Sequence, residues 1–162
     1  MFDLQRVALG ADELAEPFRA AVIAFPDAVE LDNGVYSPLA VQLVRALQAR
    51  GVDADFEHQG DQRVVRGRLF GELIAQLSIG FGEAVAGAGA WAALVAAFRL
   101  VVKDLPDDRQ RVRIRLLRQR TTAAGPTETV GVEYDGPLHE FPEALGQLNW
   151  PSEDNTQQEP AS

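Results

Sequence analysis

The sequence feature that most restricts the fold is a run of fifteen residues, 84 to 98, without a charged or polar side chain. The run lies between Glu83 and Arg99, and most of its residues are alanine or glycine. Its large apolar residues, with two valines that follow, recur at the spacing of one helix face. They are Trp91, Leu94, Val95, Phe98, Val101 and Val102. The segment 84–102 therefore predicts a helix around which the rest of the chain is organised.

Three environments are open to this helix. In a core, its small residues would let a neighbouring helix or sheet approach closely, and this is the environment we favour. The same small residues would also suit self-association. A membrane-spanning helix is disfavoured, because it needs about 20 apolar residues and would here have to include Arg99. Interaction candidates on this segment are Trp91, Phe98, Ala86, Ala90 and Ala93.

Length and composition favour one folded unit. Of the 162 residues, 46% are apolar, which is enough for one domain over residues 1–150. Residues 151–162 are acidic and polar and predict a disordered tail. The absence of cysteine excludes thiolate nucleophiles and zinc or iron–sulfur sites built on thiolates. His58 and His139 lack metal-ligand spacing, so we expect surface histidines, no metal and no cofactor.

Charge argues against two kinds of partner. The formal net charge is −9, and three negative residues lie in the tail, which leaves −9 + 3 = −6 for the folded part. Such a balance disfavours nucleic acid and anionic membranes as partners. Lys103, the single lysine, follows no phosphate-loop pattern. The amino terminus shows no secretion signal, so a cytoplasmic location is the expectation.

The first half of the chain predicts alternating strands and helices. Ser37 and Pro38 form a clear helix start, and Gly51 a matching stop. The turn Asp32-Asn33-Gly34 is expected to end the strand before that helix. The predicted elements are a strand at 2–9, a helix from Asp12 to Phe25, a strand at 28–31, a helix at 38–50 and a strand at 52–57.

The region that follows has two interpretations. Residues 63–68 can fold back on strand 52–57 as a hairpin, or Arg63 can begin a helix that reaches Leu77. Leu69, Leu73 and Leu77 show helical spacing, and Ser78 to Gly82 interrupts it.

The strongest predicted strand, Arg111 to Leu116, alternates arginine with apolar residues. Its expected partner is Val130 to Asp135, paired so that residue numbers sum to 246. That register places Arg111 opposite Asp135 and Arg113 opposite Glu133. A last short helix is expected from Pro142 to Leu148.

Arg111, Arg113 and Arg115 belong to the one concentrated basic feature of the sequence. We favour a hydrated face neutralised by Glu133 and Asp135 across the hairpin. An acidic protein partner is the next interpretation, because arginine binds carboxylates with two parallel hydrogen bonds. Nucleic acid is the least favoured, since no row of aromatic residues accompanies the arginines.

Other chemistry has weak support. Gly80-Phe81-Gly82 and Gly87-Ala88-Gly89 lack the third glycine of a dinucleotide fingerprint. Glu83, at the head of the apolar helix, is a candidate acid for a hydrolase or transferase, because burial there would raise its pKa.

The order of elements resembles a known family. The Gly/Ala-rich helix, then Arg111-Val-Arg-Ile-Arg-Leu-Leu, Thr129-Val-Gly-Val-Glu-Tyr and Phe141-Pro-Glu-Ala-Leu follow the layout of effector-associated constant components, accessory proteins of actinobacterial conflict systems. The likeness covers about the last 70 residues in pattern. It implies an adaptor role with no catalytic residues.

The sequence therefore predicts an α+β fold with a small mixed sheet and a C-terminal antiparallel hairpin packed against helices. The leading functional hypothesis is a non-enzymatic interaction module with a protein partner or a second copy of itself. Membrane association through 84–102 and an enzyme using Glu83 are the alternatives.

Overall fold

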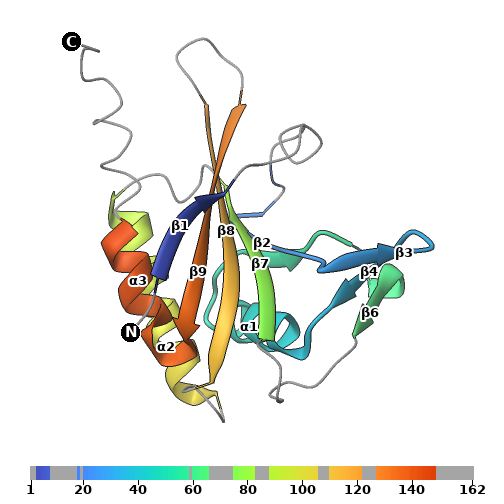
Figure 1. Cartoon of the computed structure of the whole chain (residues 1–162), viewed down its shortest axis with the longest axis horizontal. Helices are drawn as coiled ribbons and strands as arrows, with labels where there is room; N and C mark the ends of the chain where they lie inside the picture. The colour runs from blue at the N-terminus through green and yellow to red at the C-terminus, as the bar shows by residue number, and fades with distance from the viewer. Residues whose placement is uncertain are drawn as a thin grey trace.

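The computed structural model describes residues 3–7, 18, 20–58, 60–65, 75–82, 88–105, 110–121 and 127–148. In these residues the chain has an α+β fold, as the sequence predicts, with helices packed on a six-stranded sheet and a separate three-stranded sheet (Figure 1). The predicted tail at 151–162 lies outside the described residues.

The six-stranded sheet is mixed. Its strands, in spatial order, are β1 (Asp3–Val7), β9 (Thr127–Pro137), β8 (Arg111–Thr121), β7 (Ala75–Phe81), β2 (Val22–Phe25) and β5 (Ala54–Phe56). The pairs β7–β8 and β2–β5 are parallel, and the other pairs are antiparallel. Parallel neighbours need a long crossover, and a helix between β7 and β8 supplies one.

The second sheet, which we call the small sheet, has the order β3 (Ala28–Glu30), β4 (Asn33–Tyr36) and β6 (Arg63–Val65). Strands β3 and β4 are antiparallel, whereas β4 and β6 are parallel. A short 3-10 helix, η2 (Gly60–Gln62), leads into β6. The small sheet lies at the far end of the molecule from the helices α2 (Ala88–Asp104) and α3 (Phe141–Leu148) (Figure 1).

Three helices pack together on one face of the six-stranded sheet: α1 (Pro38–Ala49), α2 (Ala88–Asp104) and α3 (Phe141–Leu148). The 3-10 helix η4 (Leu138–Glu140) precedes α3. The Ser37 hydroxyl accepts a hydrogen bond from the Ala40 N–H at 3.3 Å, as an N-cap does. Gly51 follows α1 at φ +80°, a backbone conformation that favours glycine.

The core is held by a continuous series of edge-to-face aromatic contacts. The Phe81 ring on β7 lies 5.2 Å from Trp91 and 6.3 Å from Phe98, both on α2. Phe98 lies 5.5 Å from Phe141 of α3, which in turn lies 5.3 Å from Tyr134 of β9. Edge-to-face contact is a favourable geometry for aromatic rings. These contacts join α2 to β7 and to α3, and they join α3 to β9.

A smaller apolar cluster lies on the opposite face of the sheet. The Phe18 and Phe25 rings meet edge to face at 5.2 Å. They lie over Gly80, where a Cβ would come within 2.6 Å of both rings. The Phe18 N–H also donates a hydrogen bond to Gln119 Oε1 at 2.7 Å. Gly80 therefore sits inside β7 as a site of close packing, and it is not the interruption that the sequence suggests.

Two predicted helices are wrong where they can be compared with the structure. The end of the predicted helix 12–25 is strand β2, and the end of the predicted helical stretch 69–77 is the start of β7. Both strands have neighbours on either side in the sheet, and buried strands have continuous apolar runs that periodicity cannot tell from a helix. Residues 8–17 and 66–74 lie outside the described residues.

Neither interpretation of residues 63–68 is confirmed. Residues Arg63–Val65 form strand β6, so Arg63 does not begin a helix. The strand does not fold back on the predicted strand 52–57 either, because β6 pairs with β4 and β5 pairs with β2.

The C-terminal hairpin is confirmed, but its predicted register is wrong by two residues. Paired residue numbers sum to 248, so that Arg113 is opposite Asp135 and Arg115 is opposite Glu133. A shift of two keeps every side chain on its face, whereas a shift of one would exchange the faces. The alternation of charged and apolar residues therefore predicts which face of the sheet each side chain occupies, but it does not decide between registers that differ by two residues.

We expect Phe98→Ala to lower the free energy of unfolding by about 3–5 kcal/mol, because it leaves a cavity between α2, β7 and α3. Urea unfolding followed by circular dichroism measures the change. Leu100→Ala on the same helix is the matched control, since Leu100 is 55% exposed and its loss should change stability by no more than about 0.5 kcal/mol. Equal effects of the two substitutions would contradict this account of the core.

Candidate interaction surface

The predicted interaction residues of α2 are divided between the core and the surface. Trp91 is 5% exposed and Phe98 is fully buried, and the Trp91 indole N–H donates to the Leu145 carbonyl at 3.3 Å. The structure therefore assigns both aromatic side chains to the core of the chain itself. Ala90 and Ala93 are exposed, and Ala86 lies outside the described residues.

The close packing that the sequence suggests for the small residues of α2 is present at Ala97, which is partly buried against the core, but not at the exposed Ala90 and Ala93. Between Gly89 and Ala96 the outward residues of α2 are small and uncharged, and Leu100 extends this face. The large residues take the inward face because they bury more apolar area. Among the described residues, none of the helices combines the length and apolar character needed to cross a membrane.

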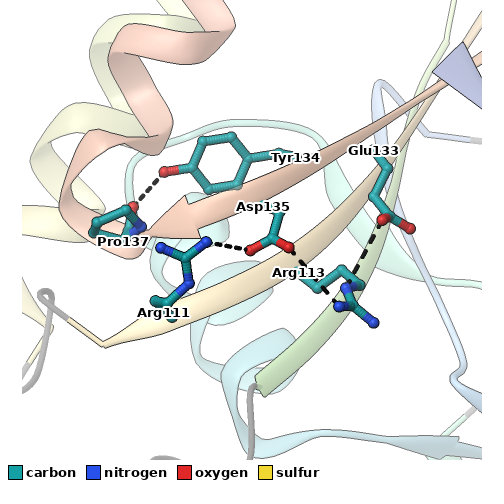
Figure 2. A network of polar contacts seen from close by, with 6 residues as sticks. All are labelled: Arg111, Arg113, Glu133, Tyr134, Asp135 and Pro137. Carbon is teal, nitrogen blue, oxygen red and sulfur yellow. Dashed lines mark hydrogen bonds and ion pairs between the residues drawn. The ribbon is translucent and has the colours of Figure 1, made fainter. Parts of the chain in front are cut away.

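The predicted arginines lie on the sheet face opposite the helices and are accompanied by acids. Arg111 Nη2 lies 2.9 Å from Asp135 Oδ1. Arg113 lies 3.8 Å from both Asp135 Oδ2 and Glu133 Oε1 (Figure 2). The expected pairs Arg111–Asp135 and Arg113–Glu133 thus form diagonally, since long side chains reach diagonal neighbours. Arg115 is half-buried and faces Glu133 across the ladder.

Tyr134 lies between Glu133 and Asp135 in the sequence, but its side chain is fully buried in the core. It extends to the other side of β9 from Asp135, and its hydroxyl donates to the Pro137 carbonyl (Figure 2). Burial raises the pKa of Tyr134 well above its usual value. The hydroxyl therefore stays protonated and acts as a hydrogen-bond donor.

The small sheet is attached to the rest of the chain through Tyr36. This side chain is 1% exposed and meets the Phe56 ring edge to face at 5.1 Å. Its hydroxyl accepts the backbone N–H of His58 at 3.1 Å and lies 3.2 Å from His58 Nδ1. Burial raises the pKa of Tyr36. The Arg63 guanidinium also lies 4.2 Å from the centroid of the Phe56 ring, a cation–π contact.

The turn between β3 and β4 is not at the predicted place. A Cβ at Gly34 would lie 2.5 Å from His58 Nδ1, so this glycine provides space for the His58 ring. The turn is formed instead by Leu31 at φ +50° and Asp32 at φ +67°. Positive φ at both central residues is the type I′ geometry that tight hairpins favour. His58, whose ring lies over Gly34, is half-buried. The prediction of a surface histidine is therefore wrong for this residue.

Exposed apolar side chains gather at the small sheet. Leu31 is 95% exposed, Val29 60% and Val65 52%. Among the described residues, the other large apolar side chain exposed to this extent is Leu100. Sequence reasoning missed these residues. The available signal was a leucine between two acids, Glu30 and Asp32, directly before a turn-forming pair.

Three exposed acids flank this apolar edge: Asp27, Glu30 and Asp32. Burial of its carboxyl group raises the pKa of Asp27 to about 6, although the residue as a whole keeps much of its surface in water. Asp27 also donates its backbone N–H to the Val35 carbonyl at 2.8 Å.

The described residues contain no group of three metal-ligating side chains placed to hold an ion. Glu83, the candidate catalytic acid, lies outside them. His139 is exposed as predicted and lies 3.6 Å from Glu140. Comparisons of the chain with protein-family models, curated proteins and solved structures found no significant match. A functional proposal therefore rests on the geometry of the surface.

Gly34→Ala should lower the free energy of unfolding by about 1–3 kcal/mol, because the added methyl group overlaps the His58 ring. Chemical denaturation measures the loss. The same substitution in a His58→Ala background should have a smaller effect. Gly146→Ala in α3 is the control, because its added Cβ meets nothing within 4 Å. Replacing a glycine inside a helix with alanine should raise the free energy of unfolding by about 0.5–1 kcal/mol.

Asp27→Asn should remove a pH-dependent loss of stability. The folded-state pKa, about 6, is above the ordinary value of 3.8, so the stabilising contribution is complete below about pH 3.8 and is lost as pH rises through 6. Wild type should therefore be less stable than the variant at pH 7 and similar to it at pH 4. The difference should be at most about 1 kcal/mol, because solvent screens a partly exposed group. Parallel stability-versus-pH curves of the two proteins would contradict the assignment.

Proposed function

We propose that this protein is a non-enzymatic protein-interaction module and that the small sheet is its contact surface. The observation that carries the proposal is Leu31, which is 95% exposed at the tip of the β3–β4 hairpin. A leucine side chain exposed to this degree is stabilised when a partner removes it from water. Exposed apolar clusters with polar surroundings often mark protein contacts.

The backbone at Leu31 supports a functional origin for this exposure. A residue with a Cβ is disfavoured by roughly 1–2 kcal/mol in the left-handed region, and a leucine lacks the polar side chain that helps Asn and Asp there. Conformations of this kind persist where the surrounding structure holds them, and they cluster at binding sites.

The attachment of the small sheet favours specific recognition. Tyr36, Phe56 and His58 pack β4 against the body of the protein, and Arg63 covers Phe56 from β6. A rigid surface loses little conformational freedom on binding, which leaves more of the contact energy for affinity.

The alternatives have less support. For a membrane, the acids beside Leu31 would be repelled by an anionic surface. For nucleic acid, the arginines of β8 are accompanied by the carboxylates of Glu133 and Asp135. The adaptor role in a bacterial conflict or defence system, implied by the resemblance to effector-associated constant components, belongs to the same class as our proposal and stays a prediction.

Site-specific photo-crosslinking tests the proposal. A photoreactive amino acid replaces Leu31 in the host cell, and the matched control carries it at Gln147, an exposed position on α3. We expect a discrete protein adduct from position 31 and none of the same mass from position 147. Excess wild-type protein should suppress the adduct, and excess Leu31→Asp protein should not. The identified partner is then titrated as a purified protein, and identical adducts from both positions would contradict the proposal.

A further inference from the structure

Strand β3 is an outer strand of the small sheet, and among the described residues it pairs with β4 alone. The two-residue turn at Leu31 and Asp32 makes Glu30 and Asn33 the hydrogen-bonded pair that closes the hairpin. Hydrogen-bonded and non-hydrogen-bonded pairs alternate along an antiparallel ladder. The N–H and C=O of Val29 therefore point away from β4, towards the open edge.

The side chains of this edge alternate between apolar and acidic. Val29 and Glu30 lie on opposite faces of β3, because successive strand residues point to opposite sides. Val29 is 60% exposed, and Leu31 continues the apolar surface at the turn. Of the described residues from 27 to 32, the charged ones are Asp27, Glu30 and Asp32, which are acidic and exposed.

The charges at this edge indicate which kind of strand could pair with β3. Open edges of natural sheets are often guarded by lysine or proline, and the three residues of β3 contain neither. Acids at the edge repel the same edge of a second copy and attract a basic strand. Among the described strands, β8 alternates arginine with apolar residues, and it is paired with β7 on one side and β9 on the other. The outer strand β6 carries Arg63, but this guanidinium is held over the Phe56 ring. The described outer strands of a second copy therefore offer no alternation of basic and apolar residues.

We infer that the outer edge of β3 takes up an extended segment of a protein partner in which basic and apolar residues alternate. The segment adds a strand to the small sheet, with backbone hydrogen bonds to the N–H and C=O of Val29. Its apolar side chains lie beside Val29 and Leu31, and its basic side chains lie beside the acids. This inference rests on the proposed function and specifies the chemistry of the partner at the same surface.

The probe is a synthetic heptapeptide of alternating lysine and valine, capped at both ends and titrated into ¹⁵N-labelled full-length protein. We expect chemical-shift changes at the backbone amides of residues 27–32. A peptide with the same side chains and alternate N-methylated backbone nitrogens should bind at least tenfold more weakly, because it cannot complete the ladder. A peptide of alternating glutamate and valine should not bind.

Matched variants of the protein place the contact. Val29→Lys should weaken binding of the lysine–valine peptide at least tenfold, because it adds a like charge at the edge. Val65→Lys adds the same charge on the other outer strand, β6, and should leave the affinity within about twofold. Equal binding of the N-methylated peptide, equal effects of the two variants, or shift changes elsewhere on the chain would overturn the inference.

The outcomes for the inference and for the proposed function can be told apart. A partner crosslinked from position 31, together with no shift change at 27–32 on adding the peptide, would overturn strand addition and leave the interaction module standing. Peptide binding at the edge, without any specific adduct from position 31, would support strand addition and count against the proposed cellular role.

Discussion

The fold depends on one set of contacts, the edge-to-face series that joins Trp91, Phe81, Phe98, Phe141 and Tyr134. These rings connect α2 to β7, to α3 and to β9, and α2 is also the crossover that makes β7 and β8 parallel neighbours. Because the large apolar residues of α2 other than Leu100 lie on its inward face, most of its alanines are exposed. An alanine-rich face exposes little apolar area per residue, so α2 can be uncharged along that face at small cost.

The small sheet depends on a second and smaller set of contacts, centred on Tyr36. The ring of Tyr36 packs on Phe56 and its hydroxyl on the backbone of His58, while the aromatic series of the core lies in other elements. Tyr36 and Phe56 belong to the same buried core as the aromatic series. They hold the small sheet against this core while the side chains of its outer strand β3 stay exposed.

The helices α1 and α2 could be predicted because their capping residues and apolar spacing are visible in the sequence itself. Ser37, Pro38 and Gly51 bound α1, and the spacing of large residues identifies α2. Strands β2 and β7 were missed because each is covered by partners distant in sequence, and apolar runs carry no period that separates helix from strand. The hairpin was found, but its register was not, because a shift of two residues keeps Arg113 with acids and Ile114 with apolar residues. The candidate interaction surface was missed for a similar reason. Asn33 and Gly34 are good turn residues, and the contact of Gly34 with the ring of His58, which is distant in sequence, could not be predicted.

The exposure of Leu31 follows from this displaced turn, but the displacement does not require a leucine. The His58 ring occupies the space over Gly34, and the two residues before Asn33 form the turn with positive φ. Such positions favour Asn, Asp or Gly, and Asp32 meets that demand. Leucine gains nothing from the turn, and at 95% exposure it gains nothing from the core. Contact with another molecule is the explanation that we propose for this exposed leucine, and the acids on either side would favour a molecule that presents basic groups beside apolar ones.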